Sequence, residues 1–101
     1  MKEQRVQRVL NAMKENGIPQ MIISDSTAIF YLTGKWIHPG ERLLALYLTV
    51  NGNHKLVINE LFPQNEDLGV ELVWYNDIQD GVAILNEILE HDKKIGIDKT
   101  W

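Results

Sequence analysis

The stretches LLALYLTV (Leu43–Val50), NG (Asn51–Gly52) and HKLVI (His54–Ile58) decide the fold of this chain. The first is apolar at almost every position and lacks the strict alternation of a half-exposed strand, which predicts a central strand covered on both faces. Asn-Gly is the strongest short signal for a hairpin turn, because both residues tolerate positive φ. The sequence therefore predicts an antiparallel pair of buried strands.

The segments before this hairpin predict a helix, a strand and a second helix. Lys2–Asn16 has apolar residues at helical spacing, and Gly17 followed by Pro19 is typical of a helix end. Met21–Ile23 predicts a short buried strand. Residues 27–33 predict a short helix that ends at Gly34, in which Phe30, Tyr31 and Leu32 pack on the sheet.

The segments after the hairpin complete an α/β pattern. We expect a short helix or turn over Glu60–Glu66, a strand over Val70–Tyr75, a long helix that begins at Asn76-Asp77, and a last strand over Lys94–Asp98. The apolar face expected of the long helix consists of Val82, Leu85, Ile88 and Leu89. This order predicts one domain with a mixed sheet and helices on both of its faces.

Composition excludes several classes of function. A net charge of −4 and scattered basic residues argue against a nucleic-acid-binding surface or an anionic membrane surface. The chain has no cysteine, which excludes disulfides, thiolate zinc sites and a thiol nucleophile. The charged N-terminus has no apolar segment typical of a signal peptide, so we expect a cytoplasmic protein.

Motifs of catalysis and cofactor binding are absent from the sequence. No two glycines have the G-x-G spacing of nucleotide-binding loops, and neither Ser24 nor Ser26 lies in a G-x-S-x-G motif. The three histidines, at 38, 54 and 91, lie far apart, and we expect His54 to be exposed. We therefore assign no catalytic residue and no metal ligand to this chain.

The segment Lys35–Arg42 is the candidate functional loop. It holds an indole, an imidazole, an acid and a guanidinium, the side chains that commonly anchor interfaces and ligand pockets, namely Trp36, His38, Glu41 and Arg42. In the alternative interpretation, Trp36 and Ile37 fold back as a local apolar lid while Glu41 and Arg42 are merely solvated. The residues of the loop alone leave both interpretations open.

Taken in order, these segments resemble the creatinase/prolidase N-terminal domain, which precedes the pita-bread metallopeptidase domain. The matching stretches are Arg5–Met13, Met21–Ser24, Ile29–Gly34 (similar to the x-I-x-Y-L-T-G signature), Glu41–Leu46, Asn51–Gly52 and Ile95–Asp98. The resemblance covers nearly the whole chain and is strongest to bacterial Xaa-Pro dipeptidases. It implies a ribonuclease-H-like, three-layer α/β/α domain with a mixed sheet over residues 1–101, truncated at its C-terminal end and lacking the catalytic domain.

The resemblance also implies a function for the parent protein. In this family, two Asp, one His and two Glu of the C-terminal domain hold two divalent metal ions, often manganese, and the enzyme hydrolyses Xaa-Pro peptide bonds. The N-terminal domain is non-catalytic and contributes to a homodimer and to substrate access. Trp36 and His38 would then wall the entrance for a proline-containing peptide, while Glu41 or Arg42 would hold a terminal charge of that peptide or pair across the dimer interface.

Two other classes of function are alternatives. One is a free-standing α/β ligand-binding or protein-interaction module. The other is a nuclease, suggested by the ribonuclease-H-like fold alone; it would need clustered carboxylates that hold metal ions and a basic surface, and the net charge of −4 argues against it.

Overall fold

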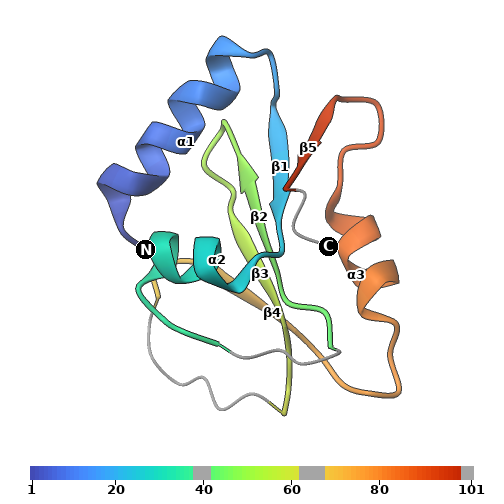
Figure 1. The fold of residues 1–101 in the computed structure, drawn as a ribbon. Coiled ribbons are helices and arrows are strands. Elements are labelled where there is room, and N and C mark those ends of the chain that lie inside the picture. The colour runs from blue at the N-terminus through green and yellow to red at the C-terminus, as the bar shows by residue number, and fades with distance from the viewer. Residues whose placement is uncertain (38–41, 62–67, 99–101) are drawn as a thin grey trace.

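The computed structural model describes residues 1–37, 42–61 and 68–98. In these ranges the elements follow the order α1 (Glu3–Glu15), β1 (Gln20–Ile23), α2 (Ser26–Thr33), β2 (Ala45–Thr49), β3 (Lys55–Asn59), β4 (Glu71–Tyr75), α3 (Gly81–Ile88) and β5 (Ile95–Ile97). The strands form one sheet in the order β4-β3-β2-β1-β5 (Figure 1). Among the described residues, no helix has both the length and the apolar character needed to cross a bilayer.

The predicted hairpin lies at the centre of this sheet. Strand β2 runs antiparallel to β3, with Leu46 opposite Leu56, and antiparallel to β1 on its other side. The outer pairs β3–β4 and β1–β5 are parallel, so the sheet is mixed, as predicted. Every residue of β2 is buried, which confirms that this strand is covered on both faces.

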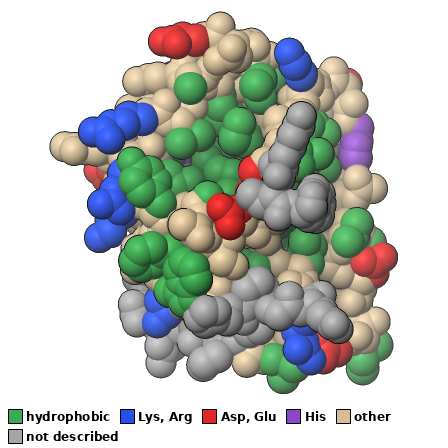
Figure 2. Space-filling view, in the orientation of Figure 1, with side chains coloured by type: hydrophobic (Ala, Val, Ile, Leu, Met, Phe, Trp, Pro, Cys, Tyr) green, Lys and Arg blue, Asp and Glu red, His purple; other side chains and the backbone are tan. Residues whose placement is uncertain are grey.

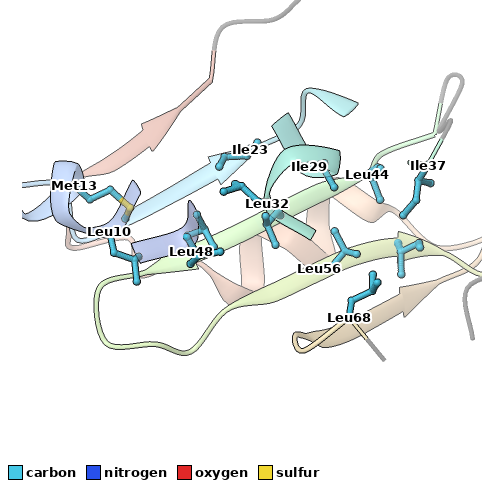
Figure 3. Packing of buried hydrophobic residues seen from close by; sticks show 13 residues of the cluster. Leu10, Met13, Ile23, Ile29, Leu32, Ile37, Leu44, Leu48, Leu56 and Leu68 are labelled. Carbon is cyan, nitrogen blue, oxygen red and sulfur yellow. The ribbon is translucent and has the colours of Figure 1, made fainter. Parts of the chain in front are cut away.

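The two sheet faces are covered by different helices, which confirms the three-layer prediction. Helices α1 and α2 lie over one face and α3 over the other (Figure 1). The larger core lies under α1 and α2, where Figure 3 shows Met13, Ile29, Leu32, Leu48 and Leu56 converging between helices and sheet. Each fully buried leucine or isoleucine stabilises the fold by about 1.5–3 kcal/mol. The smaller core under α3 consists of Ala45, Val57, Tyr75 and Leu85.

The ends of α2 agree with the sequence prediction. Asp25 caps its first turn by accepting a hydrogen bond from the Thr27 N–H at 3.3 Å. Gly34 ends the helix in the left-handed conformation (φ 82°), which glycine adopts without steric cost. This sharp end turns the chain directly into the candidate loop.

Helix α3 begins later and is shorter than predicted. Asn76 folds into a turn instead, because its side-chain oxygen accepts hydrogen bonds from the N–H groups of Ile78 and Gln79 at 3.0 and 3.1 Å. Asp80 then caps the helix through the Val82 N–H at 3.0 Å. The predicted apolar face is therefore wrong in two places: Val82 is 63% exposed, and Leu89 lies past the helix in an extended conformation.

Two further expectations about side chains are wrong. Leu32 packs into the core as predicted, but Phe30 and Tyr31 lie on the outer side of α2 and are each 44% exposed. His54 is half-buried, and its Nδ1 accepts a hydrogen bond from the Thr49 N–H at 3.1 Å. Burial lowers the pKa of His54 below its usual value.

Most of the helix or turn predicted over Glu60–Glu66 falls outside the described residues.

Candidate functional site

Arg42, at the end of the candidate loop, is held by the turn that follows β4. Its Nε and Nη2 atoms donate to the two carboxylate oxygens of Asp77 at 2.9 and 2.8 Å, a bidentate pair. Asn59, buried at the end of β3, donates from Nδ2 to the same carboxylate at 2.8 Å. The side chains of Asn59, in β3, and of Arg42, at the end of the loop, thus bind one carboxylate.

The electrostatics of this contact follow from its hydrogen bonds. The Arg42 guanidinium, and next the Asn59 amide, lower the pKa of Asp77 to about 2. The carboxylate therefore stays charged in neutral and mildly acidic solution. Both charged side chains are about half exposed, so the ion pair adds little to the free energy of unfolding. Its main effect is to fix the position of the Arg42 side chain through two parallel hydrogen bonds.

The start of the loop is held by the core. Ile37 is buried in the larger core cluster, as is Leu44 after the loop. Before it, the Thr33 hydroxyl donates to the Ile29 carbonyl at 2.7 Å and accepts from the Lys35 N–H at 3.2 Å. The described residues on both sides of the loop are therefore fixed to the body of the domain.

Aromatic side chains border the start of the loop. Trp36 is 42% exposed, and its ring packs edge-to-face with the Phe30 ring at a centroid distance of 5.7 Å and an interplanar angle of 72°. Beside this pair, the Arg5 guanidinium lies 4.6 Å from the centre of the Tyr31 ring. The result is an exposed aromatic surface next to the loop.

The structure places two of the four predicted site residues. Trp36 is exposed on the aromatic surface, and Arg42 is paired with Asp77 rather than merely solvated. His38 and Glu41 lie outside the described residues. Ile37 does pack inward, so the lid interpretation is right for that residue.

Sequence reasoning missed the partners of these residues, namely Asp77, Asn59 and Phe30. The sequence carries no local signal that links Arg42 to Asp77, because the two are 35 residues apart in the chain. The sequence carries no local signal for the contact of Phe30 with Trp36 either, because the two are six residues apart and α2 ends between them.

A metal centre does not fit the described part of the chain. In those residues no three His, Cys, Asp or Glu side chains come together in a way that could hold a metal ion. The carboxylate of Asp77 is engaged by Arg42 and Asn59, and that of Asp98 by backbone N–H groups.

Comparison with known proteins gives one family. The sequence profile described as the creatinase/prolidase N-terminal domain matches residues 5–101. No curated protein matches the chain. Among solved structures, a dipeptidase from Pyrococcus horikoshii is 28% identical with a TM-score of 0.78, over 96% of this chain and 28% of that one.

Two further solved structures share the fold. A prolidase from Thermococcus sibiricus has a TM-score of 0.87 at 20% identity, over 100% of this chain and 29% of that one. The N-terminal domain of a Xaa-Pro dipeptidase from Lactobacillus brevis has a TM-score of 0.76 at 17% identity, over 92% of this chain and 75% of that one. The chain thus spans less than a third of the two longer proteins. Its sequence and its fold agree on one assignment: this chain belongs to the creatinase/prolidase N-terminal domain family.

Proposed function

We propose that this domain is the non-catalytic N-terminal part of a Xaa-Pro dipeptidase, where it shapes substrate access and contributes to a homodimer. The peptidase part of the same polypeptide would supply the hydrolysis of the Xaa-Pro bond. The family assignment and the prolidases and dipeptidases with the same fold support this proposal.

The observation that carries the proposal is the anchoring of the candidate loop at both ends. Ile37 fixes one end in the core, and the bidentate contact of Arg42 with Asp77 fixes the other. Fixed ends suit a wall at a substrate entrance, since a segment without them would lose more ordering entropy on each binding event.

The side chains in the loop suit a short peptide with proline. Trp36 offers an exposed aromatic face, on which an apolar ring packs without a hydrogen-bonding requirement. In the proposal, His38 walls the entrance beside Trp36, and Glu41 holds the charged amino terminus of the peptide or pairs across the dimer interface. Arg42 then acts as a positioning residue, because its guanidinium is already engaged by Asp77.

The remaining parts of the proposal concern the parent protein. We place it in the cytoplasm, with two divalent metal ions, manganese, held by the peptidase part. Such ions polarise the scissile carbonyl and generate a hydroxide at neutral pH. The described residues of this chain would contribute no ligand to them.

The test is kinetic and uses the longer polypeptide that carries the peptidase part. We expect His38→Ala to raise KM for Xaa-Pro dipeptides about fivefold, the effect of losing one contact of about 1 kcal/mol. We expect the variant to accept tripeptides better, because the wall that limits length is lost, while the melting temperature stays within about 2 °C. Initial rates on matched dipeptides and tripeptides measure both effects.

Two variants control this experiment. Arg42→Ala removes the anchor and is expected to shift the length preference in the same direction, with a smaller effect on dipeptide KM. His91→Ala changes an exposed histidine beyond α3 and is expected to leave all constants unchanged. Equal kinetics for wild type and His38→Ala across all peptides would remove the loop from substrate access.

A further inference from the structure

The turn between β2 and β3 is closed by a histidine side chain. Val50, just after β2, donates its N–H to the Pro19 carbonyl at 3.0 Å, on the side of β1. Backbone groups of successive residues point to opposite edges of a strand, so the Thr49 N–H points towards β3. The paired residues of β2 and β3 end before this point, and the acceptor that Thr49 finds there is Nδ1 of His54, at 3.1 Å. The imidazole thus takes the place of a backbone carbonyl.

Thr49 also closes the turn in two other ways. Its carbonyl accepts from the Gly52 N–H at 3.1 Å, and its hydroxyl oxygen accepts from the Asn53 N–H at 2.9 Å. Thr49 is 4% exposed, so its own N–H is shielded from water, and such a group is costly to leave without an acceptor. Of these three contacts, the one with His54 alone involves a group that titrates near neutral pH.

This contact requires the neutral form of the ring. A backbone N–H only donates, so Nδ1 of His54 must carry no proton, and in the neutral ring the proton lies on Nε2. Protonation adds an N–H at Nδ1, and two donors then face each other. The hydrogen bond is lost, and the Thr49 N–H is left without its acceptor.

The charges around His54 do not compensate for this loss. Figure 2 shows side chains of both signs spread over one face of the domain, and the charged neighbours of His54 are mixed in the same way. Among the described residues, Met1 with its amino group and Glu3 line one hollow beside His54, and Lys55 and Glu71 line a second. Lys55 and Glu71 form an ion pair at 3.1 Å, so their charges offset each other. Burial remains as the cause that lowers the pKa of the imidazole.

We propose that His54 is a pH-sensitive switch for the turn between β2 and β3. The neutral ring holds the turn closed through the Thr49 N–H, and protonation at Nδ1 releases residues 50–54 while the paired strands stay intact. The turn follows the end of β2, whereas the candidate loop precedes the beginning of that strand (Figure 1). The switch therefore lies at the opposite end of β2 from the candidate loop and does not depend on the proposed function.

The direction of the pH dependence follows from the lowered pKa. The usual pKa of histidine is 6.5, and the closed turn binds the proton only at a lower pH. The closed state is therefore fully favoured above about pH 6.5, and its advantage decreases as the pH falls from there to the pKa of the closed state. Below that pKa, the closed and the open turn both carry the proton, and the advantage falls no further.

Hydrogen exchange at the Thr49 amide tests the switch in the 101-residue chain. The amide is compared at about pH 7.5 and at the lower pH at which the NMR signals of the imidazole show that it is protonated. After correction for the intrinsic pH dependence of exchange, we expect the protection factor of Thr49 to fall about fivefold or more. Leu46 and Leu56, paired in the middle of β2 and β3, are expected to change by less than about twofold.

Three substitutions separate the switch from other effects of acid. His54→Asn offers a side-chain oxygen near the position of Nδ1 that does not titrate, so we expect it to keep Thr49 protected at both pH values. His54→Ala removes the acceptor and is expected to give low protection at both. His91→Asn is the matched control, because this exposed histidine lies beyond α3, and is expected to leave the fall at Thr49 unchanged.

Three results would overturn the switch. One is a Thr49 amide that stays protected while His54 is protonated, and another is an equal fall in the His54→Asn variant. The third is a loss of protection at Leu46 and Leu56 that accompanies the loss at Thr49, since this would be acid unfolding of the whole sheet and not release of the turn.

Discussion

Replacing Gln20 with alanine is expected to lower the free energy of unfolding of this domain by about 3 kcal/mol. Gln20 is fully buried in β1. Its Nε2 donates to the carbonyls of Glu90 and Lys93 at 2.6 and 3.2 Å, and its Oε1 accepts from the Tyr47 hydroxyl and the Glu90 N–H at 2.7 and 2.9 Å. The side-chain amide of Gln20 therefore forms hydrogen bonds with backbone groups of the segment between α3 and β5 and with the hydroxyl of the buried Tyr47.

The loss is large because alanine leaves several polar groups without partners. Each buried group that loses its partner costs about 1–3 kcal/mol, and water entering the space recovers part of that. Since 1 kcal/mol shifts the melting temperature of such a small domain by about 4–8 °C, we expect a decrease of roughly 12–24 °C. Thermal and urea unfolding followed by circular dichroism measure it.

A matched substitution separates this network from a general effect of losing a glutamine. Gln4 is exposed on α1, and its side chain makes no hydrogen bond with any described residue. We expect Gln4→Ala to change stability by less than about 0.5 kcal/mol. A loss below about 1 kcal/mol for Gln20→Ala would show that the network does not hold β5 and its connection in place.

The second large effect is expected at Asp98, where alanine should lower the free energy of unfolding by about 2 kcal/mol. One carboxylate oxygen of Asp98 accepts from the Ser24 N–H and hydroxyl at 3.0 and 3.1 Å, and the other from the Asp25 N–H at 2.8 Å. These bonds join the end of β5 to the turn between β1 and α2. Hydrogen bonds to charged groups are worth about 1.5–3 kcal/mol, and partial exposure reduces that here.

Local readouts make this prediction specific. With Asp98→Ala, hydrogen exchange is expected to quicken in β5 and at Ser24 and Asp25 before it quickens in β2 and β3, because the edge opens first. Asp98→Asn keeps one acceptor oxygen and is expected to lose about half as much stability. Asp92→Ala, in the exposed turn before β5, serves as the control and should be neutral. Uniform exchange across the sheet would contradict the assignment of Asp98 to this edge.

The features of the fold that could be predicted from the sequence are those determined by neighbouring residues in the chain. The Asn51-Gly52 turn dictates an antiparallel partner for the apolar run, and an all-apolar strand has to lie in the middle of a covered sheet. Gly34 ends α2 because few other residues adopt its conformation at low cost. These signals need no knowledge of distant residues, and all of them are confirmed.

What could not be predicted depends on contacts far apart in the chain. Asn76, Asp77 and Asp80 are all good helix caps, and local sequence does not choose among them. The structure uses Asp77 for Arg42 and Asn59, so the helix begins after Asp80. Gly81 also has to be a glycine, since a side-chain carbon there would lie 2.9 Å from the buried Tyr75 ring.

The candidate site shows the same division. The residue types of the loop predict a place for recognition, and the structure shows that Trp36, at its start, is exposed. The anchor at Asp77 and the edge-to-face contact with Phe30 emerge once β4 and α2 are placed on the sheet. A short apolar segment such as Ile29–Leu32 does not reveal which side faces water, and for this reason the prediction that Phe30 and Tyr31 pack on the sheet is wrong.

We propose that this domain assists a metallopeptidase without performing the chemistry, and hydrolysis of Xaa-Pro dipeptides in the presence of manganese is the decisive assay for this claim. The 101-residue chain and the longer polypeptide are assayed side by side, together with equilibrium dialysis for bound manganese. We expect no turnover and no stoichiometric manganese in the 101-residue chain, and both in the longer polypeptide. Turnover of Xaa-Pro dipeptides by the 101 residues alone would contradict the claim.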